Sequence, residues 1–200
     1  MRLFVALDVR GDIGEQLFAW QRRLQQTPAQ VRWVRPDQYH ITVKFIGLAE
    51  TAQLDPICRR LDQAAAQVPA FPLVIQGLSR LESRGKVRII MAEIGSPGRR
   101  ITRLHRLIDQ EMGALGFDLD TRPLRPHLTL GRVRSNHSLN KLLRRLEHYN
   151  ADRMDPLGPW WISEALLMES IPSPEGTSYR RLHRAPLPPA APSDPANHHA

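Results

Sequence analysis

The chain contains one cysteine, three lysines and no long apolar run. Cys58 has no partner for an internal disulfide, and no cysteine cluster could hold zinc. Its helical spacing from Leu54, Ile57 and Leu61 predicts a buried structural thiol on the apolar face of a helix rather than a nucleophile. The chain has no stretch of 18 apolar residues, the length that a membrane-spanning helix needs. The start, Met1–Asp8, is too short for the apolar part of a signal peptide and predicts a strand. We therefore expect a cytoplasmic protein without a membrane segment.

The scarcity of lysine contrasts with an excess of arginine. The chain has 25 arginines against three lysines, a net charge of +8 and a pI near 10.7. A basic surface favours polyanionic partners because bound phosphates release their counterions. The same bias also arises from genome composition, with charge serving solubility. Charge alone leaves both interpretations open.

One short pattern occurs twice, as His40-Ile41-Thr42-Val43 and His127-Leu128-Thr129-Leu130. On a β-strand, residues two apart share a face and lie about 6.7 Å apart, so each histidine stands beside a threonine. The aliphatic residues between them point into a core. Two imidazoles and two hydroxyls are suited to in-line chemistry at phosphorus if the two strands face each other.

The rest of the chain alternates between strand and helix patterns. The helices are marked by apolar residues at helical spacing, by Asp55-Pro56 at one start and by Gly116 at one end. We expect strands at 2–8, 31–34, 39–46, 71–78, 87–94, 126–133, 160–169 and 178–184, and helices at 12–26, 55–67, 101–115 and 138–149.

This order predicts an α+β fold with two lobes. A comparable run of elements surrounds each motif, and the motif histidines are 87 residues apart. We expect a pseudo-twofold axis, with two antiparallel β-sheets lining a central cleft and helices packed outside. Residues 1–185 form this single bilobal domain in the prediction. The proline-rich segment 186–200 is expected to be a disordered tail.

Both motifs resemble a known family in their wider context. The segments Tyr39–Gly47 and Arg122–Arg132 are similar to the 2H phosphoesterase superfamily, and more narrowly to the bacterial RNA 2′,3′-cyclic phosphodiesterases, also called 2′-5′ RNA ligases. The likeness covers roughly residues 1–187. Met91 and Met168 stand where many relatives carry aromatic residues, and both positions bear on nucleotide preference.

The resemblance implies hydrolysis of a 2′,3′-cyclic phosphate to a 2′-phosphate, with no metal and no cofactor. An acid and a base must flank the phosphate in such a reaction, and imidazole has the unperturbed pKa nearest neutrality. The resemblance suggests His40 as proton donor and His127 as proton acceptor, although the sequence leaves the two roles interchangeable. Thr42 and Thr129 would donate hydrogen bonds to the phosphoryl oxygens.

Further substrate contacts are less sharply indicated. Lys44 and Arg125 share face parity with their motif histidines and are candidates for the cleft, with a solvated surface role as the alternative. Arg132 has the opposite parity, but Gly131 permits a bulge, and the resemblance makes Arg132 a phosphate contact. Phe45 is a candidate base platform or a core residue. Tyr179 matches a recurrent family position and is the last candidate.

Three other classes of function compete with this interpretation. A zinc hydrolase lacks its usual signs, because the chain has no His-Glu-x-x-His and no carboxylate beside either motif histidine. An RNA-binding module would explain the charge but not the histidines. Another 2H activity, such as 3′-end trimming of RNA or opening of an ADP-ribose cyclic phosphate, would use the same motifs. The expected partner is RNA with a 2′,3′-cyclic phosphate end, or a cyclic nucleotide, bound by a monomer.

A 2′-5′ ligase activity is the second part of the family name. The chain has no Gly-x-x-x-x-Gly-Lys-Ser/Thr loop and no Lys-x-Asp-Gly nucleophile, which disfavours ATP-driven adenylylation. Joining of 2′-5′ ends would have to reverse the cyclic-phosphate chemistry. Water favours hydrolysis unless the cleft excludes it. We therefore expect hydrolysis to dominate, with weak, reversible, ATP-independent ligation beside it.

Overall fold

Strands and helices alternate along the chain as the sequence predicts. The computed structural model describes residues 1–9, 11–95, 98–151, 155–174 and 176–190. In these ranges the strands are β1 (Arg2–Asp8), β2 (Val31–Trp33), β3 (His40–Leu48), β4 (Phe71–Ser83), β5 (Lys86–Ile94), β6 (His127–Val133), β7 (Leu157–Ile162), β8 (Glu164–Ser173) and β9 (Gly176–Pro186). The helices are α1 (Gly11–Gln25), α2 (Leu54–Ala65), α3 (Gly98–Gly113) and α4 (Leu139–Ala151), with short 3₁₀ turns η1 (Pro36–Gln38) and η2 (Thr51–Gln53).

The strand order reveals the twofold relation between the halves. Hydrogen-bonded neighbours follow the order β7-β4-β5-β6-β3-β1-β8-β9, and β2 pairs with β6. The order is symmetric about the contact between β6 and β3. The series β1-α1-β3-α2 therefore corresponds to β5-α3-β6-α4. We call β3, β1, β8 and β9 the β3 half, and β6, β5, β4 and β7 the β6 half. The predicted α+β fold with antiparallel strands is confirmed.

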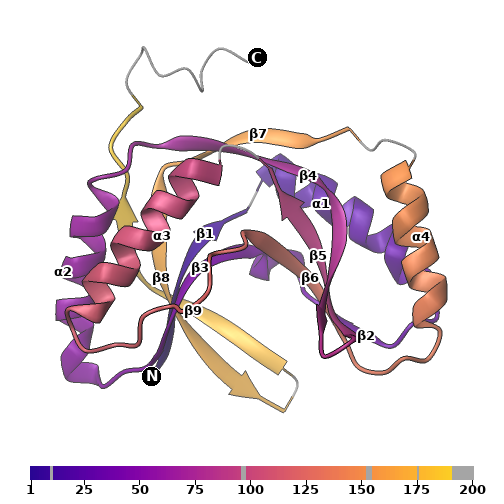
Figure 1. Ribbon diagram of the computed structural model, residues 1–200, viewed down its shortest axis with the longest axis horizontal. Helices are drawn as coiled ribbons and strands as arrows, with labels where there is room; N and C mark the ends of the chain where they lie inside the picture. The colour runs from indigo at the N-terminus through magenta and orange to yellow at the C-terminus, as the bar shows by residue number, and fades with distance from the viewer. Residues whose placement is uncertain (10, 96–97, 152–154, 175, 191–200) are drawn as a thin grey trace.

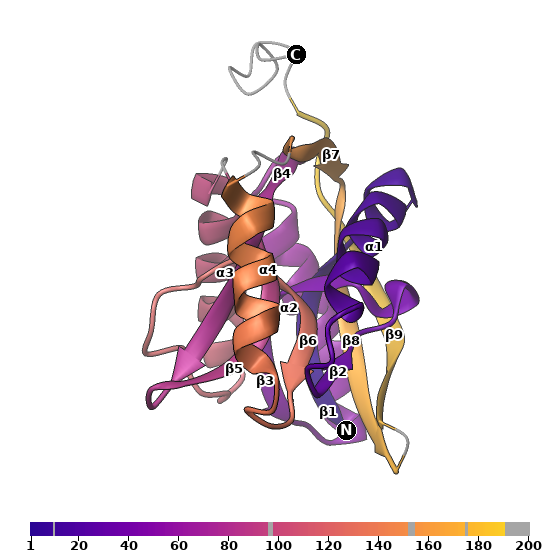
Figure 2. The ribbon, with the colours of Figure 1, turned by 90° about the vertical axis from the view of Figure 1, so that its right-hand side faces the viewer.

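The two halves exchange helices. Helix α1 follows β1 but packs against β7 and α4, at the side that faces the viewer in Figure 2. Helix α3 follows β5 but packs against β3 and α2, on the other side of the molecule (Figure 1). Helices α2 and α4 stay with the halves that precede them, on β8 and β9 and on β4. Each half thus covers part of its sheet with a helix from the other, which supports one folding unit.

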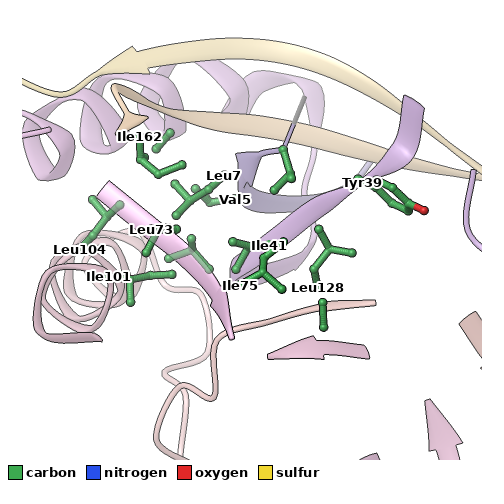
Figure 3. Packing of buried hydrophobic residues seen from close by; sticks show 14 of the residues in the cluster. Val5, Leu7, Tyr39, Ile41, Leu73, Ile75, Ile101, Leu104, Leu128 and Ile162 are labelled. Carbon is green, nitrogen blue, oxygen red and sulfur yellow. The ribbon is translucent and has the colours of Figure 1, made fainter. Parts of the chain in front are cut away.

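The halves meet where the two motif strands touch. Ile41 of β3 pairs with Leu128 of β6, and both side chains are fully buried. Figure 3 shows them packed with Ile75 of β4 on the helix-covered side of the sheet. Because of this pairing, the two predicted sheets are halves of one hydrogen-bonded sheet, which corrects that detail of the prediction.

A second correction concerns the predicted strand at 160–169. The structure divides this stretch into β7, which pairs with β4, and β8, which pairs with β1 and β9. The chain crosses from one half to the other at Ser163. Apolar residues on both sides, including Ile162 and Ala165, are buried in the same core, so the sequence shows no break in hydrophobicity there.

The packed chain also extends beyond the predicted boundary at residue 185. Leu187 is buried, and its backbone N–H donates to the Ser163 carbonyl. The Pro188 carbonyl accepts a hydrogen bond from the Ala70 N–H at 2.7 Å. The prediction that the disordered tail begins at residue 186 is therefore wrong for residues 186–188, because Pro186 pairs with Glu164 of β8 and the next two residues bond to Ser163 and Ala70. Residues 191–200 lie outside the described residues.

No helix in the described part of the chain combines the length and the apolar composition that a membrane-spanning helix requires.

A close approach beside β6 provides a test of the fold. Gly131 pairs with Trp33 of β2, and a Cβ added at Gly131 would lie 2.5 Å from Val31 Cγ1 and 2.9 Å from Trp33 Cε3. We predict that Gly131→Ala lowers the free energy of unfolding by about 1–3 kcal/mol through overpacking, measured by urea denaturation.

Gly14 of α1 supplies the matched control. A Cβ there meets the Val9 carbonyl oxygen at 3.4 Å, an ordinary contact, and alanine favours helix over glycine by about 1 kcal/mol. Gly14→Ala should therefore be neutral or stabilising. Equal unfolding midpoints for the two variants would contradict the proposed close approach.

Candidate active site

The two motif strands carry the same irregularity at the same place. On β3, Lys44 pairs with Val5 and Thr42 pairs with Ala6, so Val43 has no partner on β1. On β6, Gly131 pairs with Ile90 and Thr129 with Met91, so Leu130 has no partner on β5. Each unpaired residue stands three positions after its motif histidine. Such a bulge reverses which face the following residues occupy.

Before the bulges, the motif residues occupy the predicted faces. Ile41 and Leu128 are buried in the core, whereas His40, Thr42, His127 and Thr129 are partly exposed on the opposite face. The Ile41–Leu128 pair is antiparallel. Continued by one residue on either side, its register sets His40 across from Thr129 and Thr42 across from His127. We call the face that carries these four side chains the cleft face.

Both motif histidines are held through the same ring nitrogen. His40 Nδ1 lies 2.7 Å from the Gln38 carbonyl oxygen, and His127 Nδ1 lies 2.8 Å from that of Arg125. A carbonyl only accepts hydrogen bonds, so each Nδ1 carries a proton and donates it. Nε2 is then a base in the neutral ring and an acid in the charged ring. Each Nε2 is thereby the nitrogen available to a substrate.

The turn before His40 is itself anchored. Gln38 is the last residue of η1, and its side-chain amide donates to the Thr177 carbonyl at 3.2 Å. The hydroxyl of the next residue, Tyr39, donates to Gln21 Oε1 of α1 at 2.8 Å. The carbonyl that orients the His40 ring is thus tied to β9 and to α1.

Burial lowers the pKa of His40. The positive charges of Arg132 and His127 act in the same direction, whereas the hydrogen bond to Gln38 and the negative charge of Asp8 oppose it. These influences also show that Arg132, His127 and Asp8 lie within electrostatic reach of His40. In the free protein the imidazole is therefore shifted towards its neutral form.

An aromatic wall surrounds His40. Its ring centroid lies 4.9 Å from that of Tyr179, in an edge-to-face arrangement, and 5.2 Å from that of Phe4. Phe4 also contacts Phe45 at 6.2 Å, and the two residues are a cross-strand pair. Phe45 is 68% exposed, so the alternative of a core phenylalanine is wrong. The bulge at Val43 turns it to the cleft face, where an exposed ring can stack on a base.

The two arginine candidates differ in position. Arg132 pairs with Ile89 of β5, beyond the bulge at Leu130, and its charge acts on His40. The bulge therefore brings Arg132 towards the cleft face as the sequence allowed. Arg125 precedes β6, with its guanidinium 3.8 Å from the Glu93 carboxylate and its side chain 61% exposed. Its carbonyl, rather than its side chain, bonds the His127 ring.

The prediction that Lys44 reaches the cleft is wrong. The bulge at Val43 turns Lys44 to the helix-covered face, where it is 2% exposed. Its ammonium lies 2.7 Å from Asp109 Oδ1 of α3, 3.0 Å from Asp120 Oδ1, and 2.7 Å from the Asp118 carbonyl oxygen. These three acceptors use all three ammonium donors. Lys44 thus joins the first motif strand to the segment that leads into the second.

The same cluster has the composition of a metal site. Within the described residues, His105, Asp109 and Asp120 offer ligand atoms within 4.8 Å of one another. Lys44 already bonds both carboxylates, and His105 Nε2 lies 2.8 Å from Asp120 Oδ2. Burial alone would raise the pKa of Asp120, but the hydrogen bonds and charges of His105 and Lys44 lower it. The cluster is charge-compensated and lies behind β3, away from the cleft face.

Sequence reasoning missed several residues of the site. A cavity of about 370 Å³ opens beside His40, and its lining includes Asp8, Met168 and Arg181. Phe4 and Asp8 alternate with buried core residues on β1. Because this strand is apolar on both faces, its sequence does not indicate which residues face the cleft. Met91, paired with Thr129, lies on the cleft face with Met168, so both departures from the family pattern border the site.

Paired His-x-Thr strands in a pseudo-twofold α+β fold are the arrangement of the 2H phosphoesterases that the sequence resembles. A family model described as LigT like Phosphoesterase matches residues 7–91 and 94–156, which include both motifs. The chain belongs to the LigT-like phosphoesterase family, and the predicted family is confirmed.

Individual relatives agree with this assignment. A protein of Archaeoglobus fulgidus named RNA 2′,3′-cyclic phosphodiesterase is 29% identical over 183 residues, covering 91% of this chain and 98% of the relative. A protein of the same name from Methanocaldococcus jannaschii is 27% identical over 179 residues, covering 90% and 96%.

Solved structures share the fold. A protein of Thermus thermophilus superposes with a TM-score of 0.76 at 21% identity, covering 96% of this chain and 100% of the other. Escherichia coli LigT complexed with 3′-AMP gives a TM-score of 0.71 at 23% identity, covering 93% and 97%.

The position of Lys44 leads to a stability prediction. Lys44→Met removes the charge between Asp109 and Asp120 and leaves partly buried carboxylates without their partner. We expect a loss of about 2–4 kcal/mol in the free energy of unfolding, because removing one member of a buried ion pair exposes the desolvation cost of the other. Urea denaturation measures it.

Lys86, the first residue of β5, is the control, since it is exposed. Lys86→Met should change the free energy of unfolding by less than about 0.5 kcal/mol. If Lys44→Met were as mild as this control, the buried ion pairs of Lys44 would have no structural role, and a position in the cleft would again have to be considered.

Proposed function

We propose that the protein hydrolyses RNA or nucleotide 2′,3′-cyclic phosphate termini to 2′-phosphomonoesters by metal-independent acid–base catalysis. The observation that carries this proposal is the matched pair of histidines, each donating Nδ1–H to the carbonyl two residues before it. This anchoring leaves two Nε2 atoms for proton transfer on one face of the sheet. The names of the relatives and the family membership support the same reaction.

The proposed step is an in-line displacement at phosphorus. Neutral His127 accepts a proton from water through Nε2, and the water oxygen forms a bond to phosphorus. The bond between phosphorus and O3′ breaks on the opposite side. Charged His40 gives its Nε2 proton to O3′, so a 2′-phosphate and a 3′-hydroxyl result. Thr42, Thr129 and Arg132 would hold the non-bridging oxygens, where negative charge accumulates.

The assignment of His40 as the acid agrees with its surroundings once substrate is bound. Its lowered pKa in the free protein makes the imidazolium a strong acid but a minor form. A phosphate anion acts on the ring as Asp8 does, by favouring the charged form. Binding of the substrate would therefore help to charge the group that must donate the proton.

The proposed substrate contacts follow from the cleft face. Phe45 and Tyr179 present aromatic surface on which a base can stack, beside His40. The net charge of +8 favours RNA over neutral ligands. Arg125 would contact a phosphate further along the RNA, because its side chain is exposed next to β6. We propose a cytoplasmic monomer that needs no cofactor, with 2′-5′ ligation as a minor reverse reaction.

The central prediction concerns the histidines. His40→Ala and His127→Ala should each lower kcat by roughly 10²–10⁴-fold, because each removes one proton-transfer group. Thr42→Val or Thr129→Val should cost about 10–10³-fold, like the loss of one oxyanion donor. The assay is conversion of an RNA ending in 2′,3′-cyclic phosphate, in excess EDTA, with the product phosphate located as 2′ or 3′.

His137→Ala is the control, because His137 is an exposed histidine in the connection after β6. It should retain full activity. A parent protein that binds this RNA without converting it would point to another 2H substrate or to a binding module. Activity that EDTA abolishes and zinc restores would contradict metal-independent catalysis.

The acid and base roles are separable through Asp8. Its negative charge raises the pKa of His40, so Asp8→Asn should lower that pKa further. The profile of kcat/KM against pH should be bell-shaped and reports the free enzyme. An acid must be protonated, so its activity is lost above its pKa. If His40 is the acid, Asp8→Asn therefore lowers kcat/KM on the alkaline side of the profile and leaves the acidic side unchanged.

The opposite assignment makes a distinct prediction for the same variant. A base must be deprotonated, so with His40 as base Asp8→Asn would instead raise kcat/KM on the acidic side and leave the alkaline side unchanged. Asp37→Asn is the control, because Asp37 borders the same cavity but bonds Arg35. Neither limb should move in that variant. A profile without a bell would contradict paired acid–base catalysis.

A further inference from the structure

The cavity beside His40 contains an arginine that the proposed chemistry does not use. Arg181 of β9 lines it, together with Tyr179 and His40. Arg181 pairs with Met168 of β8, and Met168 pairs with Phe4 of β1. Paired residues of neighbouring antiparallel strands share a face. Arg181 therefore lies on the cleft face, in the same cross-strand row as Phe4, whose ring contacts His40.

A bulge in β9 sets this orientation. Leu167 pairs with His183 and Met168 with Arg181, so Leu182 has no partner on β8. The arginines on either side bond acidic residues instead. Arg180 lies 2.7 Å from Glu169, and Arg184 lies 2.7 Å from Glu164. Within the described ranges, Arg181 has no carboxylate at ion-pair distance. It is thus an exposed cation in a cavity, without an anion of its own.

We propose that Arg181 binds the phosphodiester on the 5′ side of the reacting nucleotide, so that the site selects an RNA end over a single cyclic nucleotide. This inference rests on the proposed function. In the proposed displacement O3′ departs on the side of the proton donor, because water attacks from the opposite side, and the ribose stays bound to phosphorus through O2′. With His40 as donor, the ribose lies on the side of the His40 cavity. The next phosphate of the chain continues from that ribose.

The chemistry of the cavity fits a phosphodiester better than a carboxylate or a second base. The Arg35–Asp37 pair at its edge is internally neutralised, with two hydrogen bonds of 3.0 and 2.9 Å. The other carboxylate of the lining, Asp8, acts on Arg184 and His40. Arg181 is then the open positive charge, and a guanidinium fork matches two phosphate oxygens. Positively charged grooves follow the backbone of single-stranded RNA in the same way.

The experiment compares two substrates that differ by one upstream cytidine and the phosphodiester that joins it. Cytidine 2′,3′-cyclic phosphate lacks the upstream phosphate, and the dinucleotide CpC with a 2′,3′-cyclic phosphate end has it. We expect Arg181→Gln to lower the ratio of their kcat/KM values, dinucleotide over mononucleotide, roughly 5–10-fold through KM, as for a lost charge-assisted contact at an exposed site. Arg181→Lys should retain most of the ratio. Arg180→Gln, one residue away and paired with Glu169, should leave it unchanged.

Salt dependence is a second measurement that a folding defect would not reproduce. One lost phosphate contact on a single strand should reduce the slope of log(1/KM) against log[salt] for the dinucleotide by about 0.7. An unchanged ratio and slope in Arg181→Gln, or an equal loss for both substrates, would overturn the inference and leave the proposed hydrolysis intact. Failure of the parent protein to cleave either substrate would instead contradict the proposed function.

Discussion

One cross-strand contact, the pairing of Ile41 with Leu128, determines where every other group of the site can lie. It is the point at which two four-stranded halves become a single sheet. Because the paired residues point into the core, the histidines and threonines on either side of them are turned to the opposite face together. The diagonal arrangement of two histidines and two threonines is a consequence of this register. A shift of one residue would bury all four side chains.

Groups on the helix-covered face of the sheet stabilise this contact. Helix exchange covers each half with a helix from the other, so the halves cannot separate without exposing both cores. Lys44, four residues after His40, adds polar contacts behind the same strand. Its ammonium bonds α3 and the segment that precedes β6. Its ion pairs explain why a lysine of a motif strand does not face the cleft.

The paired bulges divide each motif strand into two functional parts. Before Val43 and Leu130, alternation places His and Thr on the cleft face. After them, alternation resumes with reversed parity and turns Phe45 and Arg132 to that face. One half thus supplies an aromatic surface and the other a cation, at equivalent positions of the pseudo-twofold. The cleft face is thus symmetric in its histidines and threonines and asymmetric in these two side chains, which fits the proposed substrate with a phosphate at one end and a base at the other.

Alternation along single strands was enough to predict the two His-x-Thr faces, the core positions between them and the α+β class, because these depend only on local periodicity. The sequence also indicated a bulge at Gly131, where a glycine marks it. No such residue marks Val43, so parity misplaced Lys44 and left Phe45 undecided. The roles of Phe4, Asp8 and Arg181 likewise came only from the structure. A bulge is defined by the strand alongside, and a cavity by chain segments distant in sequence, so tertiary pairing alone decided which charged and aromatic residues face the cleft.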